Sequence, residues 1–337
     1  MNNLVKIDFL NTFLIVLSLV IACILPFELF IIAYAILGPL HYITEINWIR
    51  EKGYFLNNSY WIYIIISFSA VIALPLISKL DFFANIENDT IFFIQNQLPK
   101  YTNTLIFLAL VIAYAFLFIK SKTHIIGVIF AGFITAILLN DVSTYNLFIG
   151  IFLPTIIHVY LFTLLFMWYG NIKARTSMGT VNIVLLATIP FIISFLNLDM
   201  FTYNFSDEIK NIITDNRFHV LNVNLSKLLG LSDGTKFFFY EIIDIKIQIF
   251  IAFAYTYHYL NWFSKTTVIG WHKKLTQKKS LLMLILWAIS ISIYLYDYKV
   301  GLAVLLILSL SHVFAEFPLN MISIKGIFMS IFNRKQY

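Results

Sequence analysis

Four of the seven histidines in this sequence stand inside long apolar stretches, where burying an ionisable side chain costs free energy. They are His41, His158, His258 and His312. In a membrane-spanning segment such residues bind ions, relay protons or pair across helices, so all four are candidate metal ligands. The other three histidines are interpreted as ordinary residues of helix edges and loops: His124, His219 and His272.

Two of the four histidines have a glutamate four residues further along the chain. Glu45 follows His41 and Glu316 follows His312, a spacing that puts each pair on one helix face, a turn apart. A carboxylate in that position can bind a metal directly or hold the imidazole through its second ring nitrogen. Glu45 and Glu316 are therefore the candidate catalytic residues.

The types of donor atom limit the choice of metal. Imidazoles and carboxylates without thiolates suit non-haem iron, so Fe(II) is the predicted cofactor, with zinc, copper and haem as alternatives. The single cysteine, Cys23, excludes a cysteine-based cluster and an internal disulfide. Any one of the histidines alone could equally serve an interhelical hydrogen bond, so the metal hypothesis rests on the set of four.

The composition places these residues in a membrane protein. Of the 337 residues, 60 % are hydrophobic and 12 % are charged, and the mean hydropathy is +0.86. A soluble domain is roughly 45–50 % apolar and about 25 % charged. Too few polar side chains remain to cover a soluble fold, so a disordered chain, a disulfide scaffold and a nucleic-acid-binding domain are excluded.

The apolar stretches predict an all-α polytopic bundle of about ten transmembrane helices in a single membrane domain, residues 1–337. Each stretch approaches the roughly 20 residues that a spanning helix needs. The run that follows Lys6 is interpreted as a retained helix and not as a signal peptide. The predicted spans are 9–26, 28–46, 60–78, 103–119, 124–140, 147–168, 180–197, 243–263, 281–296 and 300–323.

Lysine and arginine accumulate in alternate connections, which predicts that both termini are cytoplasmic. With that orientation the four histidines lie on four parallel spans, within roughly 6 Å of one depth at 1.5 Å per residue. The long connection 198–242 is predicted to be an outer loop. Within it, Ser206 followed by Asp207 and Glu208 is typical of the start of a surface helix.

Four short segments resemble the histidine motifs of the Brp/Blh family of membrane β-carotene 15,15′-dioxygenases. Gly38-Pro39-Leu40-His41-Tyr42-Ile43-Thr44-Glu45 resembles the first motif, and Ile156-Ile157-His158 resembles the second. Tyr257-His258-Tyr259-Leu260-Asn261-Trp262 resembles the third, with Trp262 where the family has a second histidine. Leu310-Ser311-His312-Val313-Phe314-Ala315-Glu316 resembles the last.

The resemblance implies an iron centre held by the four histidines, with Glu45 and Glu316 as further ligands or as partners of the imidazoles. It implies a dioxygenase in the cell membrane of a bacterium that uses O2 to cleave a carotenoid, or another apolar lipid from the bilayer, as in retinal biosynthesis. No nucleic-acid partner is expected, and the oligomeric state is left open.

Two other functions fit the same residues. In a transporter, the His/Glu pairs would relay protons or couple ions across the membrane. In a non-catalytic assembly subunit, the histidines would only hold helices together. The sequence has no inverted repeat of the kind that many transporters carry, which favours the enzyme.

Overall fold

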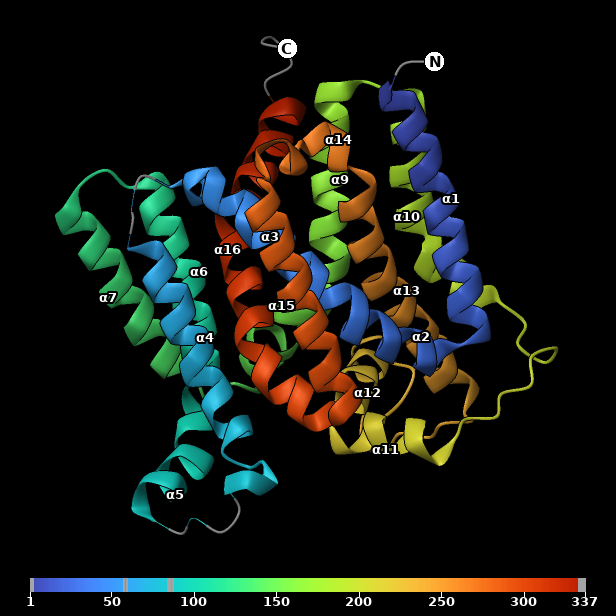
Figure 1. Cartoon of the computed structure of the whole chain (residues 1–337), viewed down its shortest axis with the longest axis horizontal. Coiled ribbons are helices and arrows are strands. Elements are labelled where there is room, and N and C mark those ends of the chain that lie inside the picture. Colours follow the sequence, from blue (N-terminus) through green and yellow to red (C-terminus); the bar gives the residue numbers. More distant parts are fainter. Residues whose placement is uncertain (1–2, 57, 59, 84–85, 87, 333–337) are drawn as a thin grey trace. The chain divides into compact units, whose positions relative to one another are not determined.

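The computed structural model describes residues 3–56, 58, 60–83, 86 and 88–332, and every regular element among them is a helix (Figure 1). The predicted all-α class is confirmed. Eight helical stretches of the described chain are long and apolar enough to cross a membrane, which supports a membrane protein. They are Asn3–Ile24, Pro26–Glu51, Asp89–Phe118, Lys122–Leu139, Ser143–Ala174, Ser177–Phe195, Gln277–Tyr296 and Tyr298–Phe332.

Two of the ten predicted spans differ from these eight. The helix α4 (Trp61–Ile77) is apolar but has only 17 residues. The helix α13 (Ile242–Ser264) has 23 residues and carries the polar side chains of Asp244, Lys246 and Gln248 in its first two turns. The number of spans and the cytoplasmic location of the termini therefore stay predictions.

Residue contacts divide the chain into two compact units. The first comprises Met1–His41, Ile156–Gln277 and Ser323–Tyr337, and the second comprises Tyr42–Thr155 and Lys278–Ile322. The single membrane domain stays a prediction. Three continuous helical segments contain residues of both units: α3 (Gly38–Glu51), η5 (Asn146–Phe162) and α16 (Tyr298–Phe332).

The first unit is built around α13, which is buried along most of its length. The helices packed against α13 are α1 (Asn3–Ile24), α2 (Pro26–Ile32), α10 (Ser177–Phe195) and α12 (His219–Leu228). A further helix, α9 (Thr163–Ala174), packs on α10. A helix whose residues are buried on all sides belongs in a core and needs no lipid-facing stripe, so α13 tolerates its polar residues where these find partners.

Polar side chains join α1 to α10 inside the first unit. The Asn182 amide donates to the Asp8 carbonyl at 2.8 Å, and the Thr12 hydroxyl donates to Asn182 Oδ1 at 2.6 Å. The Thr176 hydroxyl donates to Asp8 Oδ2 at 2.5 Å and accepts from the Gly179 amide at 3.1 Å, which caps α10. These bonds fix the two helices relative to each other more specifically than apolar contacts do.

The long connection before α13 contains two helices. Ser206 caps α11 (Asp207–Asp215), because its hydroxyl accepts from the Ile209 amide at 3.3 Å. The second is α12, which the sequence did not predict. The outer location of this connection stays a prediction.

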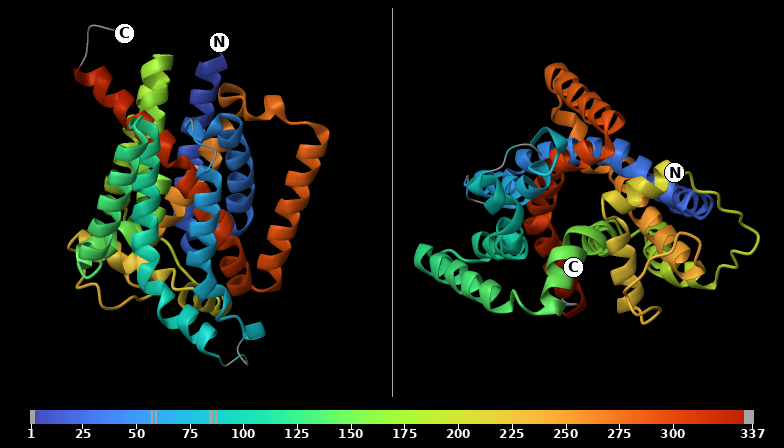
Figure 2. Two further views of the ribbon diagram at one scale, coloured as in Figure 1. Left: turned by 90° about the vertical axis from the view of Figure 1, so that its left-hand side faces the viewer. Right: turned by 90° about the horizontal axis from the view of Figure 1, so that it is seen from below.

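In the second unit, α6 (Thr102–Phe118) packs against α4 and α7 (Lys122–Leu139), and α6 and α7 lie side by side (Figures 1 and 2). Gly132 permits this approach, since a Cβ atom there would lie 2.7 Å from Val111 Cγ1. The remaining elements of the described chain are η1 (Ala33–Leu37), η2 (Gly53–Phe55), η3 (Asp81–Phe83), α5 (Asp89–Asn96), η4 (Leu98–Tyr101), α8 (Ser143–Tyr145), α14 (Thr266–Ile269), η6 (Trp271–Lys274) and α15 (Gln277–Tyr296).

Replacing Thr176 with valine is expected to lower the free energy of unfolding by about 1 kcal/mol, because α10 loses its cap and Asp8 loses a donor. Reversible unfolding in mixed micelles measures the change. Thr188→Val is the matched control on the same helix, since the exposed Thr188 hydroxyl donates to the Leu185 carbonyl within its own helix. Equal losses in the two variants would contradict this role of Thr176.

Candidate metal centre

Three of the four predicted histidines meet inside the first unit. The imidazole centroids of His41 and His258 are 4.7 Å apart, and those of His158 and His258 are 5.0 Å apart. Their side chains are buried, with exposed fractions of 1 % for His41, 2 % for His158 and 7 % for His258. We call this group the three-histidine cluster. It unites residues from α3, η5 and α13 that are far apart in the sequence.

Widened helical turns lead into two of these histidines. The π-helical segment η1 directly precedes α3 and His41. The π-helical segment η5 contains His158, with Pro154 and a distorted Thr155 (φ −118°, ψ −105°) one turn earlier. Proline removes a backbone donor, which loosens the regular helical ladder. Insertions of this kind rotate the following side chains and are frequent at functional sites.

Aromatic rings surround the three-histidine cluster. Tyr259 lies 5.2 Å from His41 and 5.5 Å from His258, and Trp262 lies 5.7 Å from His41, measured between centroids. The Trp262 ring packs edge-on against His41.

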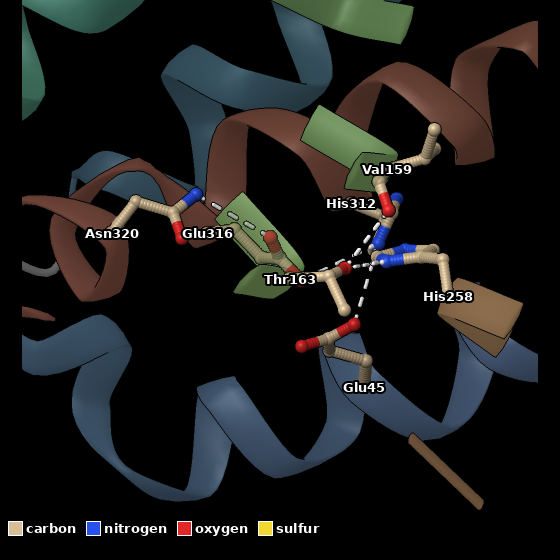
Figure 3. Close-up of polar contacts among 7 residues, drawn as sticks. All are labelled: Glu45, Val159, Thr163, His258, His312, Glu316 and Asn320. Atoms are coloured by element: carbon tan, nitrogen blue, oxygen red, sulfur yellow. Dashed lines mark hydrogen bonds and ion pairs between the residues drawn. The ribbon is translucent and has the colours of Figure 1, made fainter. Parts of the chain in front are cut away.

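Thr163 determines which nitrogen of His258 carries hydrogen. The Thr163 hydroxyl is 2.9 Å from the Val159 carbonyl and 2.8 Å from His258 Nδ1 (Figure 3). A carbonyl only accepts, so the single hydroxyl hydrogen of Thr163 is donated to Val159. With that hydrogen on the Val159 side, the Thr163 oxygen accepts from His258 Nδ1–H. His258 Nε2 consequently carries a lone pair, which is the form that binds a metal.

The fourth histidine belongs to a cluster in the second unit. His312 Nε2 lies 3.3 Å from Glu45 Oε2 and 3.7 Å from Glu316 Oε1, and all three side chains are buried (Figure 3). The Tyr42 ring packs 4.7 Å from the imidazole, and the Asn320 amide donates to Glu316 Oε2 at 3.4 Å. We call His312 with its two carboxylates the acid–histidine–acid cluster.

The spacing predicted the contact between His312 and Glu316, but it did not predict that Glu45 also lies beside His312. Asn320 could have been found, because it follows Glu316 by the same four residues. Thr163 gave no signal, since nothing in the local sequence links it to position 258. The buried residues that could hold a metal ion are His41, His258, His312, Glu45 and Glu316. The predicted ligand His158 contacts His258 but is not in these groups.

Comparisons with protein-family models, with curated proteins and with solved structures found no match for this chain. The resemblance to the Brp/Blh family therefore stays a prediction.

Replacing Thr163 with valine is expected to change the tautomer of neutral His258, because the side chain that accepts from Nδ1 is lost. Solid-state NMR of protein labelled at histidine with ¹⁵N and ¹³C distinguishes the Nδ1–H from the Nε2–H form without any metal. Wild type and Thr163→Ser should hold the Nδ1–H form, and Thr163→Val should populate the other. An Nε2–H imidazole at His258 in the wild type would contradict the assignment.

Proposed function

We propose that this chain is a membrane-bound non-haem iron oxygenase that uses O2 to cleave a carotenoid-like or other apolar lipid. The observation that supports the proposal is the three-histidine cluster. Three buried imidazoles in ring contact are hard to explain by packing, because apolar side chains would fill the same space without desolvating six ring nitrogens.

The helix α3 carries one residue of each cluster. His41 belongs to the three-histidine cluster and Glu45 to the acid–histidine–acid cluster, and the two stand four residues apart on this continuous helix. Side chains at that spacing share one helix face. In the proposal, His41, His158, His258 and His312 bind the ion, and Glu45 and Glu316 complete its ligands or orient the imidazoles.

The donor atoms fit iron. Imidazole and carboxylate ligands without thiolate are typical of non-haem iron sites, and zinc or copper could occupy the same set. Haem fits less well, because imidazoles in direct ring contact leave no room for a porphyrin between them. Bound iron would supply the redox chemistry that lets O2 react with a closed-shell lipid.

The protein's own residues would prepare the reaction in three ways. Tyr259 and Trp262 keep water from the imidazoles by packing over them. Thr163 holds His258 in the tautomer that binds metal. Glu45 and Glu316 can take a proton from His312 or return one to it. The apolar composition suits a substrate that enters from the bilayer, and the resemblance favours a bacterial cell membrane.

The acid–histidine–acid cluster also favours a second candidate function. Two buried carboxylates beside one imidazole nitrogen can pass a proton, as in proton-coupled transporters. That function needs Glu45 and Glu316 but no metal. Substrate uptake into liposomes that depends on both glutamates and is unaffected by chelators would support the transporter over the enzyme.

The metal content of the purified protein tests the proposed centre. We expect about one iron per chain after reconstitution. Loss of a ligand in His41→Ala or His258→Ala should lower the affinity by more than the roughly 10- to 100-fold that loss of a hydrogen-bond partner of a ligand costs. His124→Ala is the matched control, since His124 is exposed at the start of α7. Elemental analysis and competition with a chelator measure both quantities. Wild-type protein that retains no metal would contradict the proposed metal centre.

Expression in cells that accumulate β-carotene tests the substrate class. The proposal expects O2-dependent loss of carotenoid with formation of retinal or another aldehyde, and no product from His258→Ala. Chromatography of extracted lipids measures substrate and product together. Unchanged carotenoid beside iron-loaded protein would exclude this substrate while leaving the metal centre intact.

A further inference from the structure

The first unit contains a second site, formed by α11, α12 and the segment that leads to α13. It is a cavity of about 400 Å³, within the range of roughly 300–1,000 Å³ that small-molecule sites occupy. Its apolar walls are Val220 and Val223 of α12 and Phe237 and Phe239 of the following segment. His219, interpreted from the sequence as an ordinary surface residue, is half-buried and lines this cavity.

Hydrogen bonds and ring contacts hold the walls in place. The Asp244 carboxylate accepts from the Phe238 amide at 2.7 Å, and the Asp244 carbonyl accepts from the Asn222 side chain at 2.8 Å. The first bond fastens the segment to α13, and the second fastens α12 to α13. Phe237 and Phe239 also contact each other, with centroids 4.9 Å apart. A wall held in this way is formed before a ligand arrives, which lowers the entropic cost of binding.

The two threonines on the cavity wall present acceptors. The Thr214 hydroxyl donates to the Lys210 carbonyl at 3.0 Å, and the Thr235 hydroxyl donates to Asp233 Oδ1 at 2.7 Å. Each hydroxyl has one hydrogen, and these bonds use it. The oxygen lone pairs of Thr214 and Thr235 are what a ligand can bind.

His219 presents an acceptor as well. Its Nδ1 lies 3.4 Å from the Ile213 carbonyl, which can only accept, so Nδ1 carries the hydrogen. In the neutral imidazole, Nε2 is then an acceptor. The ring is supported by Phe237, with centroids 5.8 Å apart. All three polar side chains that line the cavity thus accept hydrogen bonds.

We propose that this cavity binds an apolar molecule that carries a hydroxyl group. Its walls match a hydrocarbon body, and its acceptors match a hydroxyl donor. A carboxylate or phosphate would bring only acceptors to the site, and a plain hydrocarbon would desolvate Nε2 of His219 without replacing its hydrogen bond. The proposal names a hydroxylated lipid as the class of ligand and is independent of the metal centre.

Photolabelling of the full-length protein in nanodiscs tests this site. Three diazirine probes of equal chain length end in a hydroxyl, a carboxylate or a methyl group. The hydroxyl probe should label cavity residues several-fold to about tenfold more than the other two, as one net hydrogen bond provides. Peptide mass spectrometry locates the labels. Equal labelling by the three probes would overturn the proposal.

Two variants separate the cavity from its polar recognition. Val223→Trp fills the cavity and should abolish labelling there, whereas Val184→Trp, on an exposed position of α10, should not. His219→Phe keeps a ring but removes the Nε2 acceptor, so it should erase the preference for the hydroxyl probe while labelling by the methyl probe persists. Labelling that survives Val223→Trp, or a hydroxyl preference that survives His219→Phe, would contradict the site.

Discussion

The cost of burying imidazoles and carboxylates among apolar helices is the constraint on which the rest of this structure depends. Such groups lose water and regain stability only through partners or an ion. The three-histidine cluster and the acid–histidine–acid cluster contain most of these groups. Neighbouring side chains supply some of these partners. The Thr163 hydroxyl lies 2.8 Å from His258 Nδ1, and the Asn320 amide donates to Glu316.

The fold accommodates this constraint through irregular helices and a buried one. The π-helical segments η1 and η5 lead into His41 and His158, and α13 carries His258 within the core of the first unit. Because α13 is enclosed by other helices, it can hold polar residues that a lipid-facing helix would expose at a cost. These polar residues also explain why α13 is not among the eight apolar helices that could cross a membrane.

The sequence predicts much of this arrangement, because an ionisable residue in an apolar run is conspicuous. The sequence predicts one depth for His41, His158, His258 and His312, and the first three have rings in contact. The four-residue spacing of His312 and Glu316 predicts the contact between these two side chains. The contact of Glu45 with His312 could not be predicted, since local spacing says nothing about distant helices. The contact of Thr163 with His258 could not be predicted for the same reason. The helix α12 was not predicted because its start at Phe218 has no capping side chain.

The coordination of iron by imidazole is the central claim, and X-ray absorption at the iron edge of the reconstituted protein tests it most directly. The account predicts the multiple-scattering pattern of several imidazoles with oxygen ligands and no sulfur. It also predicts that His258→Ala loses one imidazole from that pattern and that His124→Ala loses none. A spectrum with oxygen ligands alone, or one that His258→Ala leaves unchanged, would contradict it.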